Sequence, residues 1–311
     1  MCGIAGIIHR KGAADIGSEM TAMLQSLKHR GPDSTGFAVY GVPTKNEYVM
    51  RFKVAEQEDL SKGFQIHETV RQRRAEVDSR LAGLGVKVIE AKDATEYAFR
   101  YRIQFDGDMK KLADFVEDVE ATEILSMGTG LELIKDLGDA TVVSDQYKLK
   151  GFKGTHAIGH TRMATESDVD IRSAHPYWAY PYHDISVVHN GQLTNYWIMR
   201  RQMERKGFRF MSNCDSELIA VYIADKLDNK VDLEDAMRQS IEELDGVFTY
   251  LVATHDSLGM AKDSMAAKPM VLYESDTLVA MASEEVAIRQ IMPQEIDTFD
   301  PYDREVRVWR S

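Results

Sequence analysis

The pattern of apolar and polar positions along the chain predicts a strand-rich protein with a few amphipathic helices. Short apolar runs predict buried strands at residues 3–8, 35–40, 156–160, 185–189, 248–255, 270–274 and 278–282. Residues 18–29 place Met20, Met23, Leu24 and Leu27 on one face of a helix, which ends at Gly31-Pro32-Asp33. Residues 216–227 predict another helix, with Asp215 as the candidate N-cap.

Residues from about 53 to 153 carry a different pattern. Residues 58–84 are charged and helix-prone, residues 86–90 and 96–105 alternate like strands, residues 109–121 form an amphipathic helical pattern, and residues 123–127 predict a strand. In the second strand, Tyr97, Phe99, Tyr101, Ile103 and Phe105 share one face. This order predicts a compact α+β subdomain inserted at about 53–153 into one domain that spans residues 1–311. The insertion contains no catalytic motif, so we expect it to be structural or to dock a partner.

Composition narrows the classes of function. The net charge of −12 argues against a nucleic-acid-binding surface, which needs clustered positive charge. No stretch reaches the roughly 18 apolar residues of a membrane helix, and no secretory signal opens the chain. We therefore expect a cytoplasmic protein without a membrane or nucleic-acid partner.

Cys2 is the first candidate for chemistry. Trimming of Met1 before this small residue would leave a cysteine that carries both a thiol and a free α-amine. The thiol is then the nucleophile, and the amine is its general base. A cysteine at position 2 alone is weak support for this role, because a chance buried thiol is the more common case.

Four further blocks follow Cys2 in a fixed order. The five blocks are Cys2-Gly3-Ile4-Ala5-Gly6, His29-Arg30-Gly31-Pro32-Asp33-Ser34-Thr35-Gly36, Gly159-His160-Thr161-Arg162-Met163-Ala164-Thr165, His189-Asn190-Gly191 and Asp215-Ser216-Glu217. Together they resemble the class II glutamine amidotransferases. The resemblance covers residues 1–41 and about 155–290 and skips the insertion. It implies the four-layer αββα sandwich of the N-terminal-nucleophile hydrolases, within the α+β class.

The substrate of that family, L-glutamine, presents a carboxylate, an ammonium group and an amide. Arg162 can hold the carboxylate with a bidentate fork, and the resemblance adds Thr165 as a supporting hydroxyl. Asp215 can pair with the ammonium group, a role that the resemblance also implies. The alternatives are a surface salt bridge for Arg162 and a plain helix cap for Asp215.

The oxyanion formed by attack on the amide needs hydrogen-bond donors. The resemblance assigns this role to the Asn190 side chain and the Gly191 backbone N–H. Asn-Gly is also an ordinary turn dipeptide, so a turn is the alternative. Arg30 and Asp33 resemble the residues that support the loop over the nucleophile.

The sequence argues against three other sites. His156 and His160 have metal-ligand spacing only in a helix, and they fall in an expected strand, so no metal site is expected. Gly128-Thr129-Gly130 lacks a third glycine and a preceding Rossmann strand, so no nucleotide site is expected there. Cys214, the second of the two cysteines, has no free amine and is expected to be an inert buried thiol.

We expect no synthase domain after the amidotransferase region of this sequence. The chain resembles the small amidotransferase subunit of glutamate-synthase-like complexes, N-methylglutamate synthase among them. The resemblance lies in its length, its insertion and the sequence of residues 162–167. That resemblance implies a hetero-oligomer whose larger synthase subunits carry FMN and iron–sulfur clusters, with no cofactor in this chain. It leaves two hypotheses: a glutaminase that works through a cysteine thioester, or a catalytically silent structural subunit.

Overall fold

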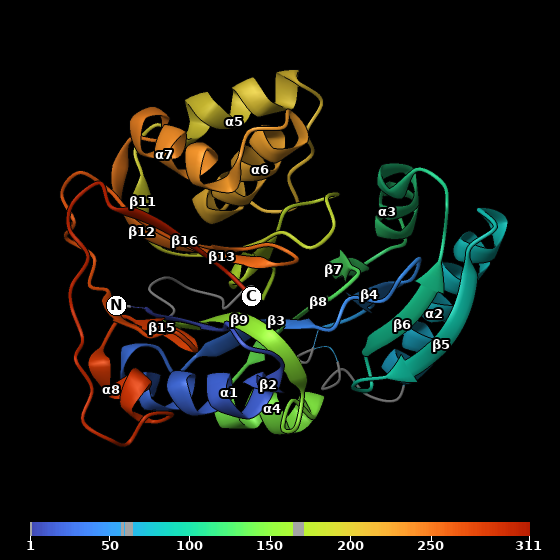
Figure 1. The fold of residues 1–311 in the computed structure, drawn as a ribbon. Coiled ribbons are helices and arrows are strands. Elements are labelled where there is room, and N and C mark those ends of the chain that lie inside the picture. The colour runs from blue at the N-terminus through green and yellow to red at the C-terminus, as the bar shows by residue number, and fades with distance from the viewer. Residues whose placement is uncertain (1, 57–58, 60–64, 164–170) are drawn as a thin grey trace.

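The computed structural model describes residues 2–56, 59, 65–163 and 171–311. Two β-sheets lie face to face, and helices cover the outer face of each sheet (Figure 1). This arrangement confirms the predicted four-layer α+β sandwich. A smaller third sheet with its own helices lies beside the four layers, at the right of Figure 1.

The first large sheet holds the beginning of the chain at its centre. Its order is β14-β15-β1-β9-β3-β8, formed by Val271–Glu274, Leu278–Ala282, Gly3–His9, Lys153–Arg162, Ser34–Gly41 and Leu131–Leu137, with the short β2 (Ala14–Asp15) paired to β9. All its pairs are antiparallel. Because Cys2 directly precedes β1, it lies at the end of an inner strand of this sheet.

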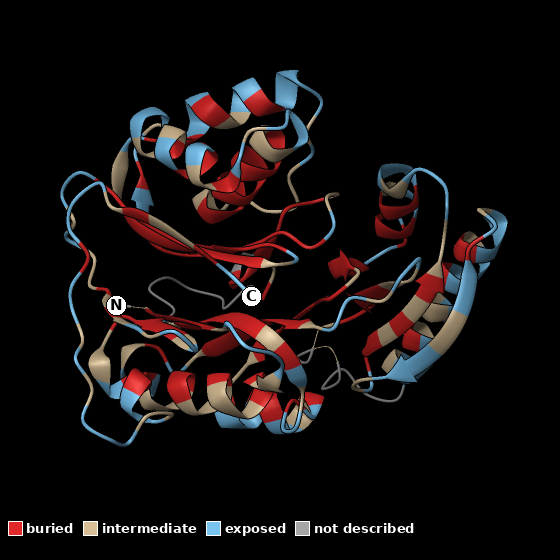
Figure 2. Ribbon diagram, viewed as in Figure 1, coloured by how far each residue is buried: buried red, intermediate tan, exposed pale blue. Residues whose placement is uncertain are grey.

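The second large sheet faces the first. Its order is β10-β11-β12-β13-β16, formed by Tyr177–Trp178, Ser186–Leu193, Gly246–Ala253, Ser257–Lys262 and Val306–Arg310. Gly6 of the first sheet shows how closely the two faces pack, because a Cβ atom there would lie 2.8 Å from Cδ1 of Leu251. Buried residues fill the space between the two sheets (Figure 2).

Helices complete the outer layers. The first sheet is covered by α1 (Ile16–Ser26), α4 (Ala140–Tyr147) and α8 (Glu285–Arg289), and the second by α5 (Tyr196–Arg205), α6 (Asp215–Asp228) and α7 (Leu233–Glu243) (Figure 1). No helix in the described part of the chain is long and apolar enough to cross a membrane.

The first helix differs from its predicted limits, 18–29, at both ends. It begins at Ile16 because the Asp15 carboxylate accepts the Ser18 N–H at 3.1 Å and caps it. It ends at Ser26 because the chain tightens into a 3₁₀ turn, Lys28–Arg30, ahead of Pro32. This turn places Arg30 next to the start of β1.

The third sheet forms the inserted subdomain. Its order is β5-β6-β4-β7, from Lys87–Asp93, Ala98–Gln104, Tyr48–Lys53 and Glu123–Gly128, and it carries α2 (Gln65–Gly83) and α3 (Met109–Glu117). The predicted apolar face of β6 is confirmed, with Phe99, Tyr101 and Ile103 buried. Within the range 53–153, β8 and α4 belong to the layers of the main sandwich, whereas β4 starts before it.

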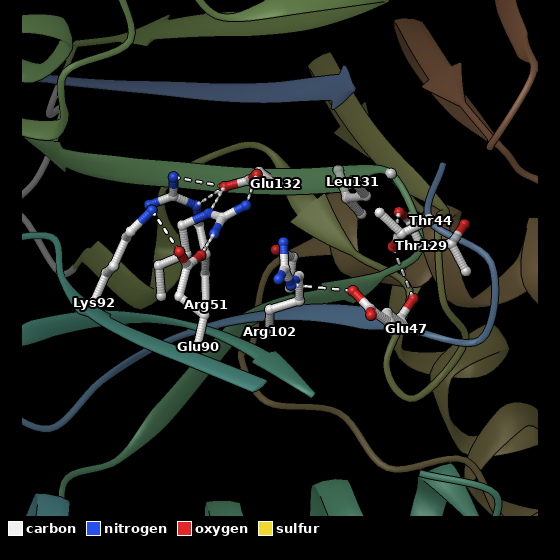
Figure 3. Close-up of polar contacts among 12 residues, drawn as sticks. Thr44, Glu47, Arg51, Glu90, Lys92, Arg102, Thr129, Leu131 and Glu132 are labelled. Carbon is white, nitrogen blue, oxygen red and sulfur yellow. Dashed lines mark hydrogen bonds and ion pairs between the residues drawn. The ribbon is translucent and has the colours of Figure 1, made fainter. Parts of the chain in front are cut away.

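A buried carboxylate joins this subdomain to the sandwich. Glu132 on β8 accepts hydrogen bonds from Nε of Arg51 on β4 and from Nε and Nη2 of Arg100 on β6, all at 2.8 Å (Figure 3). Burial alone would raise the pKa of Glu132, but the two guanidinium groups bring it below its ordinary value. Nearby, the Asp184 carboxylate accepts the backbone N–H groups of Thr129, Gly130 and Leu131.

We predict that Glu132→Gln lowers the free energy of unfolding by about 3 kcal/mol at neutral pH, because two guanidinium groups lose their buried charge partner. Glu90→Gln is the matched control, since Glu90 binds the same Arg100 from a side chain that is 30% exposed, and we expect less than about 1 kcal/mol. The pKa of Glu132 is lower in the folded protein than in the unfolded chain, so its charge stabilises the fold at pH values above the unfolded pKa and this contribution is lost as the pH falls. The destabilisation caused by Glu132→Gln should therefore shrink as the pH falls below about 4. Urea unfolding at several pH values measures both variants, and equal losses would contradict this role for Glu132.

Candidate functional site

A cavity of about 620 Å³ opens between the two large sheets and α6. Cys2, Arg162, Asn190, Gly191 and Asp215 line it together, although they come from distant parts of the sequence. Arg30 and Asp33 are not part of this lining, but each contacts a lining residue: Arg30 contacts Cys2, and Asp33 contacts Arg162. Thr165 lies outside the described residues.

Cys2 immediately precedes β1 and is partly exposed at the cavity wall. Its carbonyl oxygen accepts two hydrogen bonds, from Arg30 Nε at 3.1 Å and from Asn190 Nδ2 at 3.0 Å. One donor comes from the first sheet's side of the sandwich and the other from β11 of the second sheet. The backbone at the candidate nucleophile is therefore fixed from both sides.

Arg30 is itself held in place by an acidic partner. Its Nη1 donates to Glu284 at 2.6 Å, and its side chain is only 10% exposed. His29 contacts the same carboxylate. Burial alone would raise the pKa of Glu284, but the hydrogen bonds from Arg30 and His29 bring it below its ordinary value. Glu284 therefore stays charged at neutral pH and orients the guanidinium group that donates to the Cys2 carbonyl.

Arg162 is the last residue of β9 and lines the cavity. Asp33 contacts it through the backbone, because the Asp33 N–H donates to the Arg162 carbonyl at 3.1 Å. The Asp33 carbonyl in turn accepts the Gly138 N–H at 2.9 Å. Asp33 thus fixes the strand end from which the Arg162 side chain leaves.

Asn190 and Gly191 lie within β11, opposite Thr249 and Phe248 of β12. The interpretation of this pair as a two-residue turn is therefore wrong. Gly191 has a φ of 151°, and a Cβ atom there would lie 2.2 Å from the Val247 carbonyl oxygen. A primary amide has two N–H hydrogens, so Asn190 can hold Cys2 with one and donate the other to a ligand.

Asp215 is the first residue of α6, so its assignment as the N-cap was wrong. The cap position belongs to Cys214, which makes no capping bond through its side chain. Instead, Oδ2 of Asp215 accepts the Leu193 N–H at the end of β11, at 2.8 Å. This bond joins the helix to the strand that carries Asn190, and the helix N-terminus favours the negative charge.

Cys214 is not the fully buried thiol that was expected. It is partly exposed and lines the same cavity as Cys2. Burial and the neighbouring Asp215 carboxylate raise the pKa of its thiol. At neutral pH it is protonated, which makes it a poor nucleophile.

Three buried histidines form the part of the cavity wall that the sequence did not reveal. They are His160, His175 and His189. The rings of His160 and His175 stack at 4.1 Å. Burial lowers the pKa of His160 to about 3 and lowers the pKa values of His175 and His189, so all three are neutral at pH 7. His160 and His189 lie inside the Gly-His-Thr-Arg and His-Asn-Gly blocks, which is the available signal for these two, whereas His175 lies outside both blocks.

The expected strand geometry of His156 is confirmed, and the residue lies away from the cavity lining. It is fully buried on β9, stacks on Tyr40 at 4.2 Å, and contacts the Thr254 carbonyl at 2.7 Å. Across the residues that the structure describes, no group of three or more metal-ligating side chains could hold an ion.

The inserted subdomain contacts the segment that leads into Asp215. Lys110 on α3 donates to the Gly207 carbonyl, and Asp114 pairs with Arg209 at 3.2 Å. Further along, the Glu217 carboxylate accepts the backbone N–H groups of Met211 and Ser212 at 2.6 and 2.7 Å. The subdomain therefore supports one edge of the cavity without lining it.

Comparisons with known proteins agree with this geometry. Residues 160–290 match the family model of the glutamine amidotransferase domain. The chain is 40% identical over 313 residues to a putative glutamine amidotransferase of Methanothermobacter thermautotrophicus, covering 99% of both chains. It is 32% identical over 288 residues to the glutamine amidotransferase-like protein GlxB of Rhizobium meliloti, covering 91% of this chain and 89% of that one.

A solved structure supports the fold independently. The allosteric regulatory enzyme of purine biosynthesis superposes with a TM-score of 0.62 at 18% identity. The match covers 99% of this chain and 47% of the longer one. At this identity the likeness concerns the fold alone.

We predict that Gly191→Ala lowers the free energy of unfolding by roughly 2 kcal/mol or more, because the new methyl group meets a backbone carbonyl at a strained φ. Gly83→Ala is the matched control, since it ends α2 with open space around its Cα and should be neutral or slightly stabilising. Thermal unfolding of both variants checks the difference. A Gly191 variant as stable as the Gly83 variant would contradict the close approach.

Proposed function

Because this chain belongs to the class II glutamine amidotransferases, we propose that it hydrolyses L-glutamine to glutamate and ammonia with Cys2 as its nucleophile. The observation that carries the proposal is the lining of one cavity by Cys2, two candidate oxyanion donors and two oppositely charged side chains. A free amino acid carries an α-carboxylate and an α-ammonium group that match this charged pair. An internal residue of a peptide lacks both groups, so it does not match.

Substrate binding uses the two charged residues of the cavity. Arg162 holds the α-carboxylate through its guanidinium fork, and Thr165 adds a hydroxyl. Asp215 takes the α-ammonium group with the lone pairs left after its bond to Leu193. Each charge-assisted hydrogen bond contributes about 1.5–3 kcal/mol. The side-chain amide of the substrate then extends toward Cys2.

Attack begins when Met1 has been removed and the α-amine of Cys2 takes the proton from the thiol. Sulfur adds to the amide carbon, and the carbonyl oxygen becomes an oxyanion. The second N–H of Asn190 and the backbone N–H of Gly191 donate to this oxygen; one such donor is worth about 10²–10³ in rate. Arg30 keeps Cys2 in register by holding its carbonyl.

Collapse of the tetrahedral intermediate breaks the carbon–nitrogen bond. The amine returns its proton to the leaving nitrogen, which departs as ammonia and leaves a glutamyl thioester on Cys2. Water, deprotonated by the same amine, then attacks the thioester and releases glutamate and the thiol. Glutamine and water are consumed, and glutamate and ammonia are formed.

We further propose that the ammonia passes to a partner chain, a synthase subunit of a glutamate-synthase-like complex such as N-methylglutamate synthase. In that complex FMN and iron–sulfur clusters belong to the larger subunits, and this chain carries no cofactor. Support comes from the sequence resemblance, and from relatives that match the chain along nearly their whole length. The inserted subdomain, which contacts the segment before Asp215, offers a route by which a docked partner could influence the cavity.

Purified wild-type chain should release glutamate from glutamine, and intact-mass spectrometry should show that it begins at Cys2. Cys2→Ala should lower turnover by roughly three orders of magnitude or more, because the nucleophile is lost. Cys214→Ala is the matched thiol control and should retain turnover. A correctly trimmed wild-type chain without turnover would contradict the glutaminase and favour the alternative, a catalytically silent structural subunit.

The partner proposal predicts that the tagged chain, isolated from its native host, co-elutes with a larger subunit that shows flavin absorbance. Size-exclusion chromatography with absorbance spectra and peptide identification measures this directly. The tag belongs at the C-terminus so that Cys2 stays accessible to trimming. A monodisperse monomer from the native host would contradict the complex.

A further inference from the structure

A single buried hydroxyl lies between two of the cavity histidines. Ser216, the second residue of α6, is 1% exposed. Its Oγ lies 2.6 Å from Nε2 of His175 and 2.7 Å from Nδ1 of His189. Both distances are those of good hydrogen bonds.

The number of protons couples the two rings. A serine hydroxyl has one hydrogen and two lone pairs, so Ser216 can donate to only one of the two imidazoles, and at least one of them must donate to Ser216. Burial keeps both rings neutral, and a neutral imidazole carries one N–H. The two rings therefore cannot both accept from Ser216.

The charged neighbours decide which ring donates. Oδ1 of Asp215 lies 3.6 Å from Nδ1 of His189, and this carboxylate outweighs the opposing charge of Lys268 at that ring. The charged groups that act on His175 are Arg162 and Lys135, both cationic. The proton is therefore favoured on Nδ1 of His189 rather than on Nε2 of His175.

A contact of the Ser216 hydroxyl with Sγ of Cys214 is 3.5 Å long, and a thiol is only a weak donor. Among the residues that the structure describes, Nδ1 of His175 and Nε2 of His189 are buried and contact no hydrogen-bond partner. A second contact of the Ser216 hydroxyl, to Oδ1 of Asp215, is 3.4 Å long and much weaker than the two contacts to the rings.

We propose that Ser216 is a positioning residue that, together with the charge of Asp215, holds His189 in one tautomer, with the proton on Nδ1. His189 donates to Ser216, whose oxygen also contacts His175. The N–H of His189 then faces Oδ1 of Asp215 while Leu193 holds Oδ2, so the carboxylate keeps one orientation. For catalysis, this means that Asp215 binds the α-ammonium group of glutamine in one fixed position, a consequence that rests on the proposed function.

The tautomers can be measured without any substrate. In protein labelled with ¹⁵N-histidine, long-range nitrogen–proton correlation spectra should show the Nδ1–H form for His189, with assignment by His175→Gln and His189→Gln. An Nε2–H form for His189 would overturn the proposal. This result is separate from turnover: absent glutaminase activity with the expected tautomer would overturn only the proposed function.

A pair of serine variants tests the consequence. Ser216→Ala should lose the fixed tautomer of His189 and raise the KM for glutamine about tenfold, with a smaller change in kcat, because the carboxylate that binds the ammonium group is less well oriented. Ser240→Ala is the matched control: Ser240 is also fully buried in a helix, and its hydroxyl bonds Met237 and Tyr250 away from the cavity. It should lose stability and leave the histidine spectra and KM unchanged. An unchanged KM in Ser216→Ala, or an equal rise in Ser240→Ala, would overturn the positioning role.

Discussion

The two hydrogen bonds to the Cys2 carbonyl are the constraint on which the rest of the site depends. A chain terminus ordinarily frays, and a nucleophile located there needs to be held by its backbone. Arg30 supplies one bond and is kept in place by Glu284; Asn190 supplies the other from the opposite sheet. The same amide that holds Cys2 still has a hydrogen for the developing oxyanion. In the proposed mechanism, the Asn190 side chain therefore sets the nucleophile and the oxyanion donor at a fixed spacing.

The four-layer architecture explains why these groups can meet. Pairing of β1 with β15 and β9 places Cys2 at the end of an inner strand of the first sheet, where Asn190 of β11 in the second sheet contacts it. The Asp215 carboxylate then ties α6 to β11 through Leu193. Behind them, neutral histidines provide a wall without net charge, which leaves Arg162 and Asp215 as the charges that an amino-acid ligand would meet.

Much of this could be predicted from the sequence because local patterns encode it. The apolar runs located β1, β3, β9 and β11, and the ordered blocks identified the cavity residues. The sequence could not predict that β8 and α4 return to the main layers, because strand pairing over long separations has no local signature. Nor could it predict the contacts of Ser216, or that Asp215 binds Leu193 instead of capping its helix, because both depend on how α6 packs against β11.

The central claim is that Cys2, and not the second thiol in the same cavity, forms a covalent intermediate with glutamine. The most direct test mixes the trimmed chain with isotope-labelled glutamine, quenches the mixture in acid during turnover, and maps the label by peptide mass spectrometry. We predict a labelled glutamyl group on the N-terminal peptide that begins with Cys2. Label on the peptide that contains Cys214, or turnover without label on either cysteine, would contradict the account.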